Sequence, residues 1–193
     1  MSERCPWCGT EEIYVKYHDE EWGVPEHDSR ALWEKLILDG FQAGLSWITI
    51  LKKRDAFRSA FDGFDPVRIA EYGPDDESRL LADPGIVRHG GKIRSCIRSA
   101  QLYLEVEAGQ GFASWMWRYV DGQPLQSNLR DMADVPAATD LSKQISKDLK
   151  KQGFTFCGPT IVYAWMQATG MVNDHLVSCP RHAEIAQMPG PGG

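Results

Sequence analysis

The sequence predicts an all-α protein. Most of the 193 residues lie in segments with apolar side chains at helical spacing, capping residues bound several of these segments, and only short stretches look extended. Apolar residues make up 42% of the chain, enough for one buried core. We therefore expect one helical domain over residues 1–182 and a disordered tail over 183–193, which ends in "QMPGPGG".

The first half of the chain contains a clear helix start at Asp28 or Ser29, either of which can cap the apolar segment "ALWEKLIL". Gly40 is expected to end that helix. Two shorter segments carry acidic residues in their first turns, where they complement the positive end of a helix dipole. A few residues near Tyr14 are expected to be extended. The helices predicted here cover 27–40, 43–61, 65–72 and 75–83.

In the second half, Leu141, Ile145 and Leu149 recur every four residues, and Thr139 or Asp140 can cap the helix that they predict. The segment "GQPLQSN" interrupts the helical pattern and is expected to be extended. The helices predicted here cover 91–109, 112–120, 139–152 and 159–169.

The last two of these helices meet across the short segment "GFTFCG", residues 153–158. Glycine lets the backbone approach a phosphate closely, and the second helix would point its N-terminus at that phosphate. Lys147, Lys150 and Lys151 lie just upstream and add positive charge. A helix-hairpin-helix unit that grips DNA has this plan, although plain helix packing is the more common origin of such a pattern.

Composition narrows the class of protein. The net charge of −6 argues against DNA binding through the whole surface, but it permits a local basic patch. The sequence has no apolar run of membrane-spanning length, and "MSERCPW" does not resemble a signal peptide. We therefore expect a cytosolic protein with reduced thiols, in which five cysteines serve metal binding or packing rather than a disulfide framework.

Cysteine and histidine residues gather near both ends of the chain. Tetrahedral zinc takes four such ligands, so a complete set must join the two ends, and it would leave no obvious open position for catalysis. His175 and Cys179 lie one helical turn apart and could face one ion. Scattered thiols and surface histidines are the alternative, and a redox dithiol would need a βαβ pattern that this chain lacks. The candidates are Cys5, Cys8, His18, His175, Cys179 and His182.

A group of aromatic and polar residues predicts a pocket for a flat ligand. Aromatic faces bind planar rings and favour cations, and a carboxylate accepts hydrogen bonds from ring N–H groups. Asp39 lies near the end of its helix, where an acid is unfavourable, which suggests another role. Core packing is the alternative for the aromatics, and a surface position for Asp39. The candidates are Tyr14, Tyr17, Trp22, Asp39, Gln42 and Trp47.

Several motifs carry a family resemblance: "RCPWC", "YVKYHDEEWGVP", "FQAGLSWITILKKR", "GIVRHGGKI", "GFTFCGPTIVYAWMQATGMVNDH" and "HLVSC". They run in order from about residue 4 to residue 179, and the sequence resembles the 3-methyladenine DNA glycosylase I family. The resemblance implies an all-α, helix-hairpin-helix DNA glycosylase fold with a structural Zn²⁺ that joins the N- and C-terminal segments. It leaves Cys8 and His182 outside the site and implies the ligands Cys5, His18, His175 and Cys179.

The resemblance also implies the activity. A base-excision repair enzyme of this family hydrolyses the N-glycosidic bond of 3-methyladenine after flipping the base out of duplex DNA. No lysine nucleophile is required, so we expect a monofunctional glycosylase that leaves the strand uncut. We expect a monomer that acts in the cytosol on the DNA of the nucleoid. The alternative is a non-catalytic, zinc-stapled helix-hairpin-helix module that binds DNA without releasing a base.

Individual residues receive roles from the resemblance. Asp39 is the pocket acid, where better-known members carry glutamate, so we expect retained activity with an altered preference among 3-methylated bases. Leu45 would fill the gap that the flipped base leaves. The base-binding residues are expected to be Tyr14, Tyr17, Trp22, Gln42 and Trp47. The DNA-binding residues are expected to be Leu45, Lys151, Gly153, Gly158 and Thr160.

Overall fold

The computed structural model describes residues 4–188 and is predominantly helical, as predicted. Two short strands, β1 (Leu125–Gln126) and β2 (Val172–Asn173), pair in parallel, so the segment "GQPLQSN" does contain extended backbone. Within residues 4–188, none of the helices combines the length and the apolar character needed to span a bilayer. The helices are α1 (Glu12–Glu20), α2 (Ser29–Gln42), α3 (Trp47–Ala60), α4 (Pro66–Ala70), α5 (Pro74–Ala82), α6 (Gly90–Gly109), α7 (Phe112–Trp117), α8 (Asp140–Gln152), α9 (Pro159–Ala168) and α10 (Pro180–Ala186).

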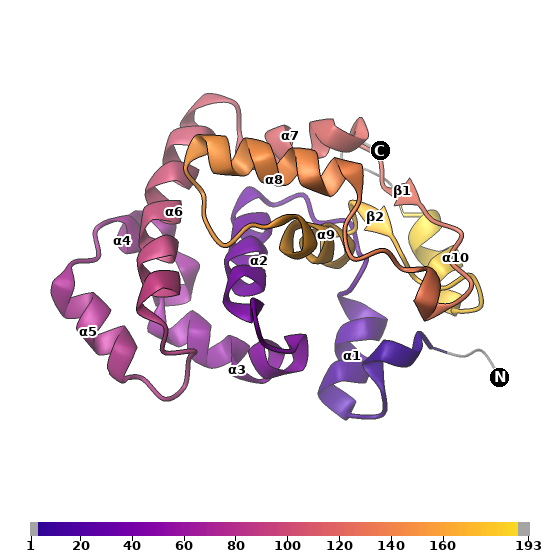
Figure 1. Ribbon diagram of the computed structural model, residues 1–193, viewed down its shortest axis with the longest axis horizontal. Helices are drawn as coiled ribbons and strands as arrows, with labels where there is room; N and C mark the ends of the chain where they lie inside the picture. Colours follow the sequence, from indigo (N-terminus) through magenta and orange to yellow (C-terminus); the bar gives the residue numbers. More distant parts are fainter. Residues whose placement is uncertain (1–3, 189–193) are drawn as a thin grey trace.

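Helix α9 lies at the centre of the molecule, packed against α2 and α8, and Figure 1 shows it nearly end-on. Its Trp165 is fully buried and donates its indole N–H to the carbonyl of Leu32 in α2 at 2.9 Å. Helices α3 to α6 lie on one side of this centre, whereas α1, α10 and both strands lie on the other (Figure 1). Segments from both ends of the chain therefore share one side of the molecule.

The connection between α2 and α3 differs from the prediction at both helix ends. Asp28 caps α2 as expected, accepting the N–H of Ala31 at 2.8 Å, but the helix continues past Gly40 to Gln42. Gly40 stays helical at a close contact, since a Cβ there would lie 3.3 Å from the carbonyl oxygen of Phe156. Helix α3 begins four residues later than predicted because Gly44 takes a left-handed conformation with φ +82°.

A buried lysine fixes this turn. Lys92 of α6 is 7% exposed, and its ammonium donates to the carbonyls of Phe41 at 2.8 Å and Ala43 at 2.6 Å. These carbonyls belong to the last turn of α2 and the residue after it, where a cation also complements the helix dipole. Lys92 therefore positions the start of the turn over residues 43–46.

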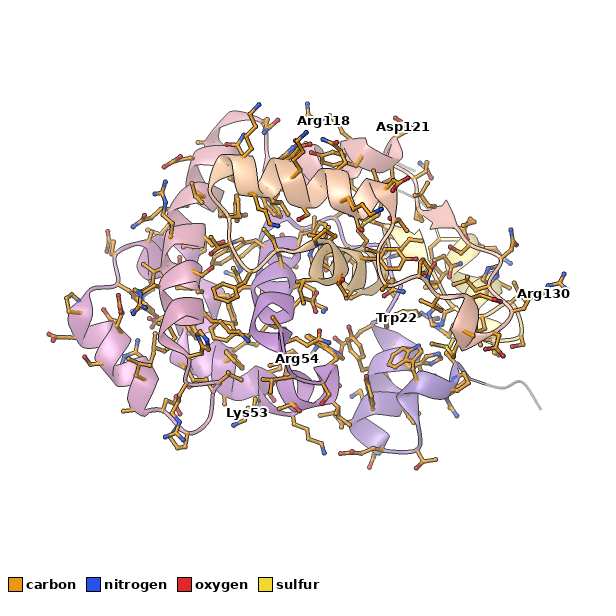
Figure 2. All side chains as sticks on the ribbon, in the orientation of Figure 1. Trp22, Lys53, Arg54, Arg118, Asp121 and Arg130 are labelled. Atoms are coloured by element: carbon orange, nitrogen blue, oxygen red, sulfur yellow. The ribbon has the colours of Figure 1, made fainter. Side chains whose placement is uncertain are left out.

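Replacement of Lys92 by methionine, which has a similar length and no charge, is expected to lower the free energy of unfolding by about 2 kcal/mol, because buried carbonyls lose a charged donor. Urea unfolding measures this change. The matched control is Lys53→Met: Lys53 donates to the carbonyls of Pro84 and Gly85 at 2.9 and 3.1 Å from the outer side of α3 (Figure 2). We expect that control to lose less than about 0.5 kcal/mol, as surface changes usually do. Equal losses would contradict this role of Lys92.

Helices α8 and α9 form the expected helical hairpin. Thr139 caps α8 by accepting the N–H of Ser142 at 3.1 Å, and Gly153 ends it in the left-handed region at φ 106°. Within the hairpin, the buried hydroxyl of Ser146 donates to the carbonyl of Cys157 at 2.7 Å. This bond ties the connecting segment back to α8 and fixes where α9 begins.

Two expectations about the chain ends are wrong. The segment near Tyr14 is helical rather than extended: it belongs to α1, and the Tyr14 ring packs 5.0 Å from that of Trp7. Its β-branched and aromatic residues favour strands on average, but packing overrides that preference. The predicted tail over 183–193 begins too early, because α10 continues to Ala186 and buries Ile185 completely. The remainder of that tail, residues 189–193, lies outside the described residues.

Candidate active site and metal site

Four buried side chains from the two ends of the chain converge: Cys5, His18, His175 and Cys179. Their ligand atoms all lie within 4.8 Å of one another. The Cys5 Sγ is 3.6 Å from the His175 Nδ1, and the Cys179 Sγ is 3.7 Å from the His18 Nε2. In a tetrahedral zinc site with usual bond lengths, sulfur and nitrogen ligands lie roughly 3.6 Å apart. The cluster therefore fits a metal ion as it stands.

Different elements supply these ligands. His18 lies in the last turns of α1, Cys5 lies upstream of that helix, and Cys179 immediately precedes α10. The predicted helical turn from His175 to Cys179 is wrong: the segment is a turn, in which Cys179 donates its N–H to the carbonyl of Leu176 at 2.8 Å. The two side chains still reach one point because the turn folds them to the same side.

Hydrogen bonds orient both imidazoles. The His18 Nδ1 lies 2.8 Å from the Asp19 carboxylate, and the His175 Nε2 lies 3.0 Å from the Trp22 carbonyl oxygen, which leaves the other nitrogen of each ring toward the cluster. Burial raises the pKa of Cys5 to about 12 and lowers the pKa of His175 to about 4. A metal cation would oppose the first shift by favouring the thiolate.

Two neighbouring candidates take no part in the cluster. Cys8 is buried, and its thiol donates to the Cys5 carbonyl at 3.2 Å. His182 places its Nε2 2.7 Å from the Ser127 carbonyl oxygen. Both residues therefore support the backbone around the cluster rather than belonging to it.

A cavity of about 210 Å³ is lined by residues of α1, α2, α3 and α9 and of nearby connecting segments. Figure 2 shows Trp22 next to α1, on the side of that helix that faces the rest of the molecule. The cavity brings together all the residues that the sequence suggested for a pocket. They are Tyr14, Tyr17, Trp22, Asp39, Gln42 and Trp47.

Aromatic rings form much of the cavity wall. The Tyr17 and Trp47 rings have centroids 5.5 Å apart, and the Trp7 and Trp22 rings 4.9 Å apart. Trp22 also packs edge-on against His175, with centroids 4.6 Å apart. The four-residue Cys/His cluster and the cavity therefore share a wall, to which Trp22 and His175 contribute.

The carboxylate of Asp39 is enclosed in this apolar setting. Asp39 is 1% exposed, and its Oδ1 accepts a hydrogen bond from the Lys35 ammonium at 2.7 Å. Burial raises the pKa of Asp39, and the lysine opposes that shift. The Asp39 Oδ2 and the Trp47 indole N–H are buried and have no partner among the described residues. The cavity thus offers an acceptor and a donor that a polar planar ligand can satisfy.

Lys35 is the cavity residue that the sequence interpretation most clearly missed. Its ammonium lies 3.5 Å from the centroid of the Trp47 ring, a cation–π contact, as well as beside Asp39. The signal was present, because Lys35 and Asp39 lie four residues apart on one helix and therefore share a face.

Three further lining residues were not among the predicted pocket residues: Trp7, Gln167 and Asp174. Gln167 and Asp174 lie seven residues apart, in a motif that carries the family resemblance. Asp174 is held by three donors: its carboxylate accepts from Tyr163, from Gln167 at 2.8 Å and from Ser127 at 2.6 Å. A carboxylate with so many donors is fixed in position and braces that wall of the cavity.

The residues predicted to bind DNA lie in two places. Leu45 is 45% exposed in the turn between Gln42 and Trp47, both of which line the cavity. The others lie on the hairpin, with Lys151 and Thr160 exposed on α8 and α9. The remaining two are the glycines that flank the hairpin segment, Gly153 and Gly158.

Known proteins are similar to this chain over most of its length. The family described as Methyladenine glycosylase matches residues 7–182. The chain belongs to the methyladenine glycosylase family. A curated member from Escherichia coli K12, DNA-3-methyladenine glycosylase 1, is 48% identical over 178 residues, covering 92% of this chain and 95% of that protein. DNA-3-methyladenine glycosylase from Haemophilus influenzae is 46% identical over 181 residues, covering 93% and 98%.

A solved structure of the methyladenine glycosylase family is also similar to this one. It is a Tyr-to-Phe variant of a 3-methyladenine DNA glycosylase I in complex with 3-methyladenine. It matches with a TM-score of 0.88 at 39% identity, covering 92% of this chain and 96% of that one. The fold of the methyladenine glycosylases therefore extends over nearly the whole chain.

Proposed function

We propose that this protein is a DNA-3-methyladenine glycosylase that acts on alkylated duplex DNA. The observation that carries the proposal is the cavity in which Trp47 and Tyr17 enclose the buried carboxylate of Asp39. The names of the two curated relatives, and the relative solved with 3-methyladenine, support the same substrate.

The chemistry follows from the charge of the damaged base. Methylation at N3 leaves adenine cationic while it is attached to deoxyribose. When the N-glycosidic bond breaks, its electron pair goes to the base, which leaves as neutral 3-methyladenine. Water supplies the new oxygen at the sugar carbon and releases a proton, which gives an abasic site. The base is already a good leaving group, so the protein mainly has to extrude it, enclose it and orient it.

We assign a separate role in this reaction to each group of cavity residues. The Trp47 and Tyr17 rings enclose the flipped base, whose positive charge their faces favour. Asp39 accepts a hydrogen bond from the polar edge of the base, and Trp22 and Gln42 complete the wall. We assign the nucleophile to water and the reaction to the monofunctional class, because the methylated base is already a good leaving group and requires no lysine nucleophile.

The experiment that tests this function is incubation of the protein with methylated duplex DNA. Mass spectrometry of the small-molecule fraction is expected to find free 3-methyladenine, and denaturing electrophoresis is expected to find intact strands that break only after alkali treatment. Duplex binding without a released base would favour the non-catalytic DNA-binding module instead. Strand breaks without alkali would contradict the monofunctional assignment.

We assign the four-residue cluster to a structural Zn²⁺. Cys5, His18, His175 and Cys179 would hold it, and two thiolates with two imidazoles form a common structural zinc set. The four ligands would complete a tetrahedron and leave no open position for a substrate. The ion would hold the two ends of the chain together.

DNA contact is assigned to the hairpin and to the turn that carries Leu45. The free N–H groups at the start of α9, at Thr160 and beyond, would bind a backbone phosphate, with Lys151 nearby. Gly153 and Gly158 would let the strand approach, and Leu45 would fill the gap left by the flipped base. We further propose a monomer that works in the cytosol, with residues 1–182 as one domain.

Substitution of Lys151 by glutamine is expected to weaken duplex binding uniformly across sequences and to reduce the slope of log K against log salt by about 1, because one phosphate contact is lost. Fluorescence anisotropy at several salt concentrations measures this slope. Lys16→Gln is the control, since Lys16 is an exposed lysine on α1, away from the hairpin. A slope unchanged in Lys151→Gln would remove Lys151 from the interface.

A further inference from the structure

Lys35 contacts the same two cavity groups that a cationic ligand would need. Its side chain is only 16% exposed, and its ammonium contacts both the Asp39 carboxylate and the face of Trp47. These two groups are the ones that would stabilise a positive charge on a bound base. The lysine therefore already occupies the cation position of the cavity.

The same lysine also borders a second cavity of about 270 Å³. Lys35, Tyr17 and Ala168 line both cavities, so they form part of the wall between them. Two ion-paired carboxylates line the second cavity: Glu21, which is 42% exposed and paired with Arg54, and Glu34, which is 13% exposed and accepts from Arg58 at 2.7 Å. The flexible Lys35 side chain therefore borders carboxylates in both cavities: Asp39 in the first, and Glu21 and Glu34 in the second.

We propose that Lys35 is a displaceable internal cation and that it determines how strongly the base cavity discriminates between charged and neutral bases. A cationic base must displace the ammonium from Trp47 and Asp39, and the ammonium then turns into the second cavity toward Glu21 and Glu34. A neutral base need not compete for the same charge stabilisation. The inference rests on the proposed function, because it assumes that the first cavity binds the base.

The consequence is a measurable change in charge preference. Lys35→Met retains the length of the side chain and removes its charge, which frees the Trp47 face and the Asp39 carboxylate for a cationic ligand. A desolvated cation–π contact is sizeable, so we expect the preference for a cation over a neutral base to rise at least about fivefold. A purely structural role for Lys35 would change both affinities together and leave their ratio unaltered.

The experiment uses two probes and tryptophan fluorescence. The probes are 3-methyladenine, which is neutral as the free base, and 3,9-dimethyladeninium, a permanent cation that carries a methyl group in place of the sugar. The ratio of their Kd values is measured for the unmodified protein, Lys35→Met and Lys35→Arg. Lys35→Arg retains the charge and is expected to keep the ratio of the unmodified protein. Lys52→Met is the matched surface control, since Lys52 pairs with Glu11 at 2.6 Å and is half exposed.

A ratio in Lys35→Met within about twofold of the unmodified value, or one shifted toward the neutral base, would overturn the proposal. If Lys35→Met does not fold, Lys35→Gln takes its place with the same expected shift. Failure of the unmodified protein to bind either probe would contradict the base cavity itself and thus the proposed function. A ratio that does not respond to Lys35 would contradict only the role of this lysine.

Discussion

Asp39→Asn is expected to lower the rate of 3-methyladenine release by about a hundredfold, the usual scale for loss of one electrostatic contact to a reacting group in a desolvated site. The amide has nearly the same shape but no charge, so it cannot stabilise a cationic base as the buried carboxylate does. Single-turnover release of the base from methylated duplex DNA measures the effect. Binding to undamaged duplex is expected to remain unchanged, because Asp39 is buried.

Asp39 forms an ion pair with Lys35, so a double variant is needed to separate the effect on stability from the effect on base release. Asp39→Asn leaves the Lys35 ammonium without its charged partner in a nearly enclosed place, which destabilises the fold on its own account. The double variant Asp39→Asn, Lys35→Met removes both charges and is expected to recover most of the lost stability without recovering base release. Release by Asp39→Asn at the unmodified rate would show that the carboxylate has no part in the reaction.

Removal of the proposed Zn²⁺ is the second change for which we expect a large effect. A chelator, or Cys179→Ala, is expected to lower Tm by roughly 10 °C, which corresponds to a few kcal/mol for a chain of this size. The loss arises because the cluster joins segments near residues 5 and 175, and its own contacts do not replace metal bonds. Calorimetry with and without chelator measures the shift, and metal analysis of the purified protein identifies the ion.

Cys8→Ala separates a metal effect from the loss of a buried thiol. Cys8 lies three residues from Cys5 and is as buried as Cys5, but it is not part of the cluster. We expect Cys8→Ala to retain one ion per chain and to keep its sensitivity to the chelator. If Cys8→Ala and Cys179→Ala lost the ion equally, the assigned ligand set would be wrong.

Local sequence patterns predicted much of the fold because caps and helical spacing act locally. Asp28 and Thr139 cap their helices as expected, since a cap bonds to an N–H only three residues away. The failures occur where distant contacts override local preference. The region of Tyr14 is helical because it packs against Trp7, and Gly40 does not end its helix because the Phe156 backbone lies against it.

Some residues of the candidate site could likewise be predicted from the sequence, whereas others could not. Residue types and family motifs predict Asp39 and Trp47 for the pocket and the four Cys/His residues for a cluster, and the fold brings each group together. The partner of Asp39 was overlooked because a lysine on an amphipathic helix is ordinarily solvent-exposed. The role of Asp174 follows from its donors, which are Ser127 and two residues of α9, Tyr163 and Gln167.

The contact between Asp39 and Lys35 bears on why this chain has an aspartate at position 39. The family resemblance implies a glutamate at this position in better-known members, and glutamate is one methylene longer. In this chain the shorter side chain is reached by the Lys35 ammonium at 2.7 Å, so acid and lysine form one unit within the cavity. The altered lesion preference expected from the sequence would then arise from the pair rather than from the shorter acid alone.

A crystal structure of this protein with 3-methyladenine bound would locate the base directly. We expect the base to lie in the cavity between Tyr17 and Trp47, with its polar edge toward Asp39. A base bound elsewhere on the protein, with this cavity unchanged, would contradict the central claim that the aromatic cavity holds the excised base.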